Sequence, residues 1–555
     1  MAKEDKRKRG PWFALEILLV LWVIGLATQA ALWHHFDEDR TYQVMSVWFI
    51  APTLVFCTLI WWTFFSGFKV VTRLAGWGVL FSIVTILMIL FRFEGFDGDF
   101  VPRFVFRWQA TAEDKFLAAR EAEAKYDGEL ALLENLDEPL EVQPGDWPQF
   151  RGPNGDGVIS DSSFRKNWSG DTPRLVWKKR VGPGWSSFII VDGLVFTQMQ
   201  IDEDEAVVCY EMESGKEVWK DPHLEKGVRF SEPRMGVGPM ATPLFYRGRL
   251  YTLGATGILN CLNPKTGEEF WSANILEDAN SKNVEWGMSG SPVAYEDMIL
   301  VNPGSDDDDE TAVAAYDWKT GEKLFSGGSN PASYSTPVVA ELDGVKQILM
   351  FDGLGLTGHS LKDGSELWHF EWGNEYDINV AKPIVRDDEA VFISTSYGTG
   401  SALLSVTRAN SGRWRVNTTD WETNSRFKLK FGDAVVKDGL IYGLSETILT
   451  CLDFKTGEIL WRMRGDYGFG QLILVNDVLV ILTDEGKVSL VEASSEHPEL
   501  LRFEAIEGKT WGHPAYAQGR LFVRNAEWMA CYDMSGNKPE ESETETKTKP
   551  ETPAE

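Results

Sequence analysis

The side chains best suited to ligand chemistry in this sequence recur just before short apolar runs in the C-terminal two thirds of the chain. They combine large aromatic rings with basic groups. The set is Trp185, Arg234, Trp286, Tyr334, Lys382, Trp511 and His513. Aromatic faces stack on flat groups and attract cations, whereas arginine and lysine bind anions through charge-assisted hydrogen bonds. If the fold gathers these residues, they predict a binding site for a polar or anionic ligand or for a peptide segment. The alternative is that they only fill space and satisfy one another.

Acidic residues in the same region could supply a base or ligate a metal ion. Asp433 and Asp377 lie near the starts of apolar runs, and Asp306–Glu310 is a continuous acidic run. A calcium-binding loop needs several oxygen ligands and a glycine at a fixed position, and the run has no such glycine. The run is more typical of a solvated turn, and isolated acids are too few for a constellation. We therefore expect neither a catalytic residue nor a metal site.

The stretch from Gly432 to Met463 shows the structural unit that would position these residues. Its first two apolar runs are joined by Asp438-Gly439, which is a strong hairpin signal because glycine adopts a positive φ without penalty. A third run, TILTCLDF, is followed by the polar turn Lys455–Glu458 and by the start of a fourth run, ILWRM. The unit therefore predicts a small antiparallel sheet of four strands.

Similar units recur, so the chain is expected to be a repeat protein. Eight first strands begin near Trp185, Met240, Ser289, Tyr334, Val380, Phe431, Phe469 and Trp511. Steps of about 38 to about 55 residues fit four-stranded blades. We predict an all-β, eight-bladed β-propeller over residues 146–536. Residues just before the first strands would then meet at one end of the central channel.

The ends of the propeller also carry a prediction. The last blade lacks a fourth strand of its own, because a polar tail follows Asp533. The segment Arg174–Val181 precedes the first blade and resembles the fourth strand at Ile459–Met463. We expect it to complete the last blade and close the ring, which removes an open sheet edge.

Cysteine spacing predicts packing rather than cross-linking. Cys209, Cys261, Cys451 and Cys531 occupy the same position of the third strand in four repeats. Equivalent positions in different blades lie farther apart than the ~4.4–6.8 Å between Cα atoms that a disulfide allows. We expect all four to be small buried apolar residues.

The turn after each third strand carries a family resemblance. A polar turn with glycine precedes a tryptophan or phenylalanine in YEMESGKEVW (210–219), LNPKTGEEFW (262–271), YDWKTGEKLF (316–325), SLKDGSELW (360–368) and LDFKTGEILW (452–461). This pattern resembles the tryptophan-docked repeats of pyrroloquinoline-quinone (PQQ) dehydrogenases. It also resembles their non-catalytic relative, the propeller lipoprotein of the outer-membrane protein assembly machine. The lead-in DWPQFRGPNG (146–155) is similar to that of bacterial PQQ-like propellers.

The resemblance implies two possible chemistries. A catalytic member would hold PQQ and Ca²⁺ on the propeller axis, with an aspartate base and often a disulfide of adjacent cysteines; no two cysteines are adjacent here. We therefore expect no cofactor, with PQQ and calcium as the alternative.

The N-terminal region predicts a membrane anchor of three α-helices. A basic start, MAKEDKRKRG, precedes apolar runs at Trp12–Trp33, Val44–Phe65 and Leu74–Phe91, each long enough or nearly so to cross a bilayer. The first run is too long for a signal-peptide core, and two more spans follow. Lys69 and Arg73 in the second loop, with an acidic first loop, place the N-terminus in the cytoplasm. The propeller would then lie outside the inner membrane, in the periplasm or its equivalent.

These patterns divide the chain into four parts. Residues 1–93 form the anchor, and 94–145 form a spacer and linker with a helix over Thr111–Glu134. The propeller covers 146–536, and an acidic tail at 537–555 is expected to be disordered because it has too few large apolar residues to bury.

Charge and topology leave two functional hypotheses. The net charge of −29 argues against a nucleic-acid partner, because phosphate binding needs surplus lysine and arginine. The favoured hypothesis is a membrane-tethered, non-catalytic propeller that binds a protein partner or an exported polypeptide. The alternative is a PQQ-dependent dehydrogenase that oxidises alcohols or sugars and passes electrons to the membrane.

Overall fold

Three apolar helices open the chain. The computed structural model describes residues 11–36, 40–96, 101–126, 139–168, 170–225, 229–232, 236–305, 310–419, 421 and 426–536. The helices are α1 (Pro11–His35), α2 (Arg40–Ile60), which continues into the π-helical turn η1 (Trp61–Phe65), and α3 (Val70–Leu90). Each is long and apolar enough to cross a membrane, which confirms the three predicted apolar helices.

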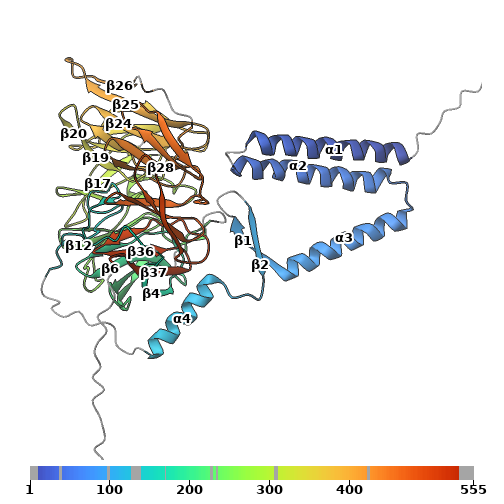
Figure 1. Cartoon of the computed structure of the whole chain (residues 1–555), viewed down its shortest axis with the longest axis horizontal. Coiled ribbons are helices and arrows are strands. Elements are labelled where there is room, and N and C mark those ends of the chain that lie inside the picture. Colours follow the sequence, from blue (N-terminus) through green and yellow to red (C-terminus); the bar gives the residue numbers. More distant parts are fainter. Residues whose placement is uncertain are drawn as a thin grey trace, which may run out of the picture.

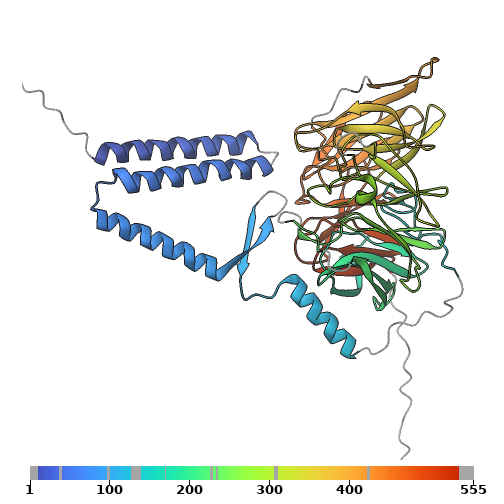
Figure 2. The ribbon, with the colours of Figure 1, turned by 180° about the vertical axis from the view of Figure 1, so that it is seen from behind.

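Polar side chains link the first two helices of the anchor. Gln29 Nε2 donates to Ser46 Oγ at 2.7 Å, and Trp22 Nε1 donates to Thr58 Oγ1 at 3.0 Å. These contacts hold α1 and α2 side by side, whereas α3 runs apart from them (Figure 1). The end of α1, the start of α2 and the end of α3 all lie on the side of the propeller (Figures 1 and 2).

The segment expected to be a helical spacer begins with strands. α3 leads directly into a two-stranded antiparallel ribbon, β1 (Phe91–Phe96) and β2 (Pro102–Phe106). α4 (Ala112–Tyr126) then covers part of the helix predicted over Thr111–Glu134, whose C-terminal part lies outside the described residues. A capping box starts α4: Asp114 N–H donates to Thr111 Oγ1, and Thr111 N–H donates to Asp114 Oδ2.

α4 docks on the propeller. Phe116 is buried in the hydrophobic core between the first and last blades. Arg120 pairs with Glu217 at 2.5 Å, and Glu113 pairs with Arg229. The helix therefore connects the membrane anchor to the outer strands of the propeller.

Eight antiparallel sheets form the blades of the propeller. Blades 1 to 4 comprise β5 (Ile189–Val191), β6 (Leu194–Ile201), β7 (Asp204–Glu211) and β8 (Glu217–Glu225); β11 (Leu244–Tyr246), β12 (Arg249–Leu253), β13 (Ile258–Leu262) and β14 (Glu269–Asn274); β15 (Val293–Tyr295), β16 (Met298–Val301), β17 (Val313–Asp317) and β18 (Lys323–Gly327); and β19 (Val338–Leu342), β20 (Val345–Phe351), β21 (Gly355–Ser360) and β22 (Glu366–Glu371).

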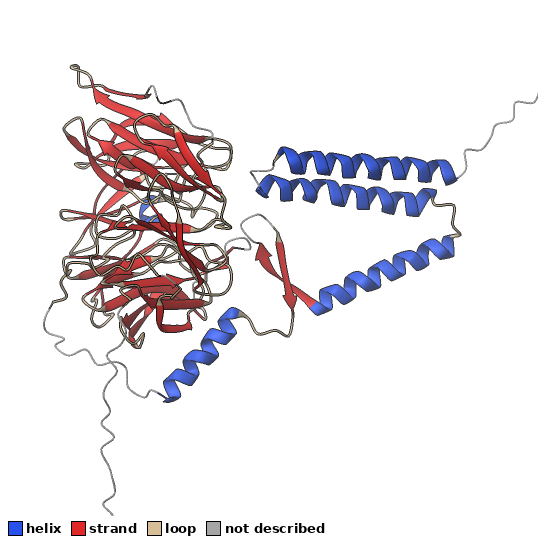
Figure 3. Cartoon of the chain, in the orientation of Figure 1, coloured by secondary structure: helices blue, strands red, loops and turns tan. Residues whose placement is uncertain are grey.

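The remaining blades repeat the pattern, and the ring has the predicted eight members. Blades 5 to 8 comprise β23 (Ile384–Asp387), β24 (Ala390–Thr395), β25 (Gly400–Arg408) and β26 (Trp414–Thr418); β27 (Val435–Lys437), β28 (Leu440–Ser445), β29 (Ile448–Asp453) and β30 (Ile459–Met463); β31 (Gln471–Val475), β32 (Val478–Leu482), β33 (Lys487–Glu492) and β34 (Glu499–Glu504); and β35 (Ala515–Ala517), β36 (Arg520–Arg524), β37 (Trp528–Asp533) and β4 (Arg174–Arg180). Figure 3 shows strands throughout this domain, with short helix α5 (Ile275–Ala279) and hairpin β9 (Ser231–Glu232)–β10 (Gly236–Val237) between blades.

The ring closes as the sequence predicts. β4 pairs antiparallel with β37, with Trp177 opposite Cys531 and Arg180 opposite Trp528. Arg174 adds an ion pair to Asp533 at 2.9 Å. The first and last parts of the propeller therefore share one sheet. Blade 7 also gains a fifth strand that the sequence did not indicate, because β3 (Val158–Ile159) pairs parallel with β31.

Glycines in the turns explain how neighbouring blades dock. Trp219 of blade 1 lies on Gly267 of blade 2, where an added Cβ would stand 2.6 Å from the indole. Trp177 lies in the same way on Gly215, and its Nε1 donates to Met212 O at 2.8 Å. Glycine is required at both positions, since φ is positive and the indole leaves no room for a side chain.

The cysteines behave as predicted. Cys209, Cys261, Cys451 and Cys531 are buried and free in β7, β13, β29 and β37, and Cys57 is free in α2. They pack as small apolar side chains.

Candidate functional site

A cavity of about 110 Å³ lies where the eight blades meet, and we call it the axial cavity. Its lining comes from every blade and from the segment that precedes them. The lining residues are Phe150, Trp185, Met240, Thr242, Trp286, Ser289, Ser291, Tyr334, Thr336, Val380, Phe431, Asp433, Gln471, Trp511 and His513. A volume of this size accommodates several water molecules or a small polar group.

Aromatic rings form one wall of the axial cavity. Trp185 and Trp511 have ring centroids 5.5 Å apart, and Phe431 lies 5.3 Å from Trp511. Trp286 and Tyr334 stack at 5.3 Å. These rings precede the first strands of five blades, where the chain approaches the axis. They present faces that suit a flat, apolar or cationic group.

A lysine already lies against this aromatic wall. Lys509 Nζ lies 3.5 Å from the centroid of Trp511 and 5.7 Å from that of Trp185. The same ammonium donates to the carbonyl of Phe96 in β1 at 3.0 Å. The aromatic side of the cavity therefore faces the ribbon β1–β2 and the membrane helices.

Polar side chains form a second layer, which we call the polar ring. Each blade contributes the residue two positions after the start of its repeat. The members are Ser187, Thr242, Ser291, Thr336, Lys382, Asp433, Gln471 and His513. Between the two layers stand small residues, such as Gly432 and Gly512, which let the backbone approach the axis.

The hydroxyl half of the polar ring, in blades 1 to 4, is a chain of hydrogen bonds. Ser187 N–H donates to Thr242 Oγ1 at 3.2 Å, and Thr242 N–H donates to Ser291 Oγ at 2.9 Å. Ser291 N–H donates to Thr336 Oγ1 at 3.0 Å. Blades 2, 3 and 4 thus each satisfy a buried backbone donor of the preceding blade.

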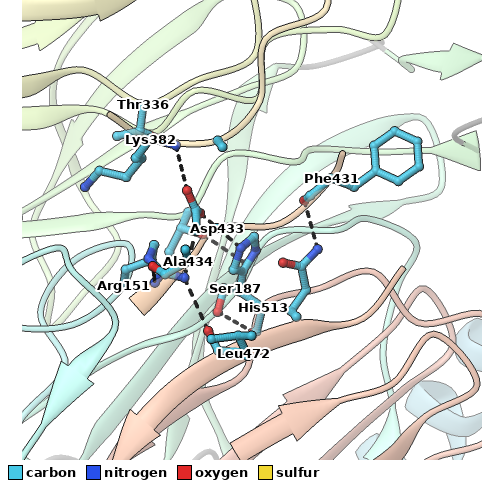
Figure 4. A network of polar contacts seen from close by, with 12 residues as sticks. Arg151, Ser187, Thr336, Lys382, Phe431, Asp433, Ala434, Leu472 and His513 are labelled. Carbon is cyan, nitrogen blue, oxygen red and sulfur yellow. Dashed lines mark hydrogen bonds and ion pairs between the residues drawn. The ribbon is translucent and has the colours of Figure 1, made fainter. Parts of the chain in front are cut away.

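The ionisable half, in blades 5 to 8, is centred on Asp433. Lys382 N–H makes the equivalent bond between blades 5 and 6 by donating to Asp433 Oδ1 at 2.6 Å. The other oxygen, Oδ2, lies 3.4 Å from His513 Nε2 and 3.8 Å from Arg151 Nη1. Figure 4 shows Asp433 between these three partners.

Arg151 reaches this half from the strap, which we define as residues 146–159. Its backbone has a positive φ of 63°. Its guanidinium donates to Ala434 O at 2.7 Å, to Asp156 O at 2.9 Å and to Leu472 O at 3.3 Å. Phe150 beside it packs edge-to-face on His513 at 4.8 Å. The strap therefore covers the charged side of the axial cavity.

Burial and neighbouring charges shift the pKa values of side chains in the ionisable half. Burial alone would raise the pKa of Asp433, but Arg151, His513 and the Lys382 N–H together hold it well below its usual range. Burial lowers the pKa of Lys382 to about 8 and also lowers that of His513, against the attraction of Asp433. At neutral pH the carboxylate is charged and balanced mainly by Arg151.

The structure gathers most of the residues singled out from sequence. Trp185, Trp286, Tyr334, Trp511 and His513 all line the axial cavity. Arg234 and the acidic residues 306–309 lie outside the described residues.

Two other singled-out residues do not line the axial cavity. Lys382 directs its Nζ to Gly155 O at 2.7 Å and lines an adjacent cavity of about 590 Å³ beside the strap. Asp377, named with Asp433 as an acid near the axis, is instead exposed in a turn, where its carbonyl accepts from Ser333 Oγ.

Sequence reasoning did not single out Arg151, Phe150, Phe431 or Gln471. One sequence signal could have identified Gln471: the third residue of each repeat start is polar in all eight blades. Nothing local marks Arg151, which lies far from Asp433 in the sequence.

The residues around Asp433 do not fit a calcium–quinone centre. Ca²⁺ takes six to eight oxygen ligands. Among the described residues that line the axial cavity, Asp433 is the only one with a carboxylate. Within the described part of the chain, no group of three or more His, Cys, Asp or Glu side chains could hold a metal ion. The donors of Arg151 are directed to three backbone carbonyls and Asp433, so they are not presented to an anionic cofactor.

Fold and site together define a class: an eight-bladed propeller that follows three helices able to cross a membrane. A family model described as "Outer membrane protein assembly factor BamB" matches residues 167–285 and 203–463. The chain belongs to this family of PQQ-like propeller repeats.

Several solved structures resemble this chain at low sequence identity. BamB from Moraxella catarrhalis is 14% identical with a TM-score of 0.45, over 66% of this chain and 99% of its own. The quinohemoprotein alcohol dehydrogenase of Comamonas testosteroni is 12% identical with a TM-score of 0.48, over 71% and 81%. The enzyme ADHIIG of Pseudomonas putida HK5 is 12% identical with a TM-score of 0.49, over 74% and 83%. Among curated proteins, no sequence matches significantly. These similarities do not show whether the protein is a binding protein or an enzyme.

Proposed function

We propose that this protein is a non-catalytic, membrane-anchored propeller that binds a protein partner or an exported polypeptide, one side chain of which enters the axial cavity. The observation that carries the proposal is the combination of an aromatic wall with an ionisable half whose charges are balanced internally. Asp433 is held by Arg151, His513 and the Lys382 N–H, so it is not presented as a base. An apolar or cationic side chain would bind the aromatic wall without requiring a cofactor.

The same proposal places the propeller outside the cytoplasmic membrane. The basic start of the chain, with Lys69 in the connection before α3 and Arg73 in the first turn of α3, favours a cytoplasmic N-terminus. An odd number of spans then carries the propeller to the opposite side. A partner or substrate polypeptide would be met there, in the periplasm or its equivalent.

Site-directed photo-crosslinking tests this function. The full chain is expressed in its native membrane with a photo-crosslinking amino acid in place of Trp286, which lines the axial cavity. A matched variant carries the same group in place of Phe270, which is 48% exposed on the outer strand β14. We expect a discrete crosslinked polypeptide from position 286 alone. Crosslinks of equal yield from both positions, or none from position 286, would contradict the proposal.

A cofactor experiment separates the proposal from the dehydrogenase alternative. The detergent-purified full chain is incubated with PQQ and Ca²⁺, desalted, and assayed for quinone absorbance and for dye reduction with alcohols and sugars. We expect no retained absorbance and no turnover. Retained cofactor with turnover would overturn the non-catalytic function.

A further inference from the structure

The ribbon β1–β2 has one face made of aromatic rings. Its register places Phe91 opposite Phe106 and Phe93 opposite Phe104. Because side chains alternate between the two faces of a strand, these four phenylalanines share one face. Their rings also touch, with centroids of Phe91 and Phe106 4.7 Å apart and those of Phe93 and Phe104 5.8 Å apart.

The opposite face of the ribbon carries two arginines beside Val105. Arg92 pairs with Val105, and Arg103 pairs with Gly95 across the two strands. Arg103 and Phe104 are neighbours in one strand, so their side chains leave the ribbon in opposite directions. The ribbon is therefore amphipathic, with a pure aromatic face.

The rest of the described chain leaves three of these four phenylalanines exposed, and Phe91 is half-buried. Phe93 is 44% exposed, Phe104 60% and Phe106 42%, and Trp108, which stacks on Phe106 at 4.8 Å, is 69% exposed. An isolated two-stranded ribbon is marginally stable in water, and large exposed apolar patches mark interaction surfaces. The aromatic face therefore requires a cover from outside the protein.

The position of the ribbon identifies that cover. β1 begins at Phe91, immediately after α3 ends at Leu90. At its other end, the ring of Phe96 lies 6.2 Å from that of Trp48, within the apolar span Tyr42–Phe65. Figures 1 and 2 show the ribbon between the helix ends and the propeller. Both ends of β1 therefore lie at the boundary of the apolar helices.

We propose that β1–β2 is an interfacial ribbon whose aromatic face lies in the headgroup region of the phospholipid bilayer. Aromatic rings prefer this region, and apolar surface there is removed from water. The inference rests on the membrane anchoring in the proposed function. One consequence is that the Lys509–Phe96 contact holds the aromatic side of the axial cavity towards the bilayer.

Depth-dependent fluorescence quenching tests the ribbon in the full chain. Cys57→Ser removes the partly exposed thiol, and the four buried cysteines are shielded from labelling reagents. Phe104→Cys is then labelled with an environment-sensitive fluorophore, and the protein is reconstituted into phosphatidylcholine nanodiscs. Some of the lipids carry a nitroxide either near the headgroup or in the middle of the acyl chain. We expect quenching at least about twofold stronger from the shallow nitroxide than from the deep one.

Two control positions show which part of the proposal is wrong if the expected quenching at position 104 is not observed. Phe81→Cys, at a 74% exposed position of α3, reports on the anchor and should be quenched most by the deep nitroxide. Phe270→Cys, on the outer edge of blade 2, should not be quenched. If position 81 is quenched and position 104 behaves like position 270, lipid does not cover the ribbon, and a protein partner becomes the cover. If position 81 is not quenched either, the membrane anchoring itself is wrong.

Discussion

The two halves of the polar ring solve the same geometric problem with different chemistry. In blades 1 to 4, hydroxyl groups accept the N–H of the preceding blade, and the half is neutral. In blades 5 to 8, Asp433 takes over this role and introduces a buried charge that needs Arg151 from the strap. A neutral chain of hydrogen bonds stabilises itself locally, whereas a buried charge depends on a residue from another part of the chain.

Among the variants that test this comparison, removal of the buried carboxylate should have the largest effect on stability. Asp433→Ala leaves Arg151, 3% exposed, without its counter-charge. We expect a loss of about 3 kcal/mol in the free energy of unfolding, because breaking a buried ion pair strands the remaining charge. Chemical denaturation of the purified full chain measures it. Asp297→Ala removes an exposed pair with Arg247 and should cost under about 1 kcal/mol. Equal losses in the two variants would show that the buried charge of Asp433 matters no more than an exposed one.

The pH dependence of stability should also originate in the ionisable half. The native pKa of Lys382, about 8, lies below that of an exposed lysine, about 10.4. Between these values the unfolded chain binds the proton and the folded chain does not, so stability rises with pH in this window. Lys382→Met should reduce that rise by on the order of 2 kcal/mol. Thermal unfolding at several pH values measures it, with exposed Lys455→Met as the unaffected control. An unchanged profile in Lys382→Met would contradict this assignment.

A hydroxyl in the neutral half should contribute less. Thr242→Val keeps the shape of the side chain but removes the acceptor of the buried Ser187 N–H. We expect a loss of about 1–2 kcal/mol in the free energy of unfolding. Thr266→Val, at an exposed turn, removes an equivalent bond to Glu268 N–H and should cost less than about 0.5 kcal/mol. A loss in Thr242→Val as large as that in Asp433→Ala would show that charge is not what distinguishes the halves.

The smallest effect is expected at Gln471. Its Nε2 donates to Phe431 O at 2.9 Å, but its buried Oε1 has no hydrogen-bond partner in the described part of the chain. Gln471→Leu removes the hydrogen bond to Phe431 and also removes the buried oxygen that has no partner. The net change in the free energy of unfolding should therefore stay below about 1 kcal/mol. A larger loss in denaturation experiments would indicate that Oε1 is satisfied by ordered water in the axial cavity.

Sequence periodicity predicted the propeller in detail because its signals are local. The Asp438-Gly439 turn, the glycine turn before an aromatic residue such as Trp219, and the unpaired fourth strand at Arg174–Val181 are each visible in short stretches of sequence. The same reasoning placed Trp185 and Trp511 together at one end of the central channel, where the structure has them. It did not distinguish the two acids near the repeat starts: Asp377 is exposed, as expected for a solvated acid, whereas Asp433 is buried.

The sequence by itself determined the number of blades, the closure of the ring and the apolar anchor, because each follows from a repeated local pattern of side chains. Only the tertiary structure decided that Arg151 neutralises Asp433, that Lys382 turns away from the axial cavity, and that phenylalanines of β1 and β2 share one face. These outcomes depend on residues distant in sequence that meet through the packing of the strap, the blades and the ribbon, and no local pattern encodes such a meeting.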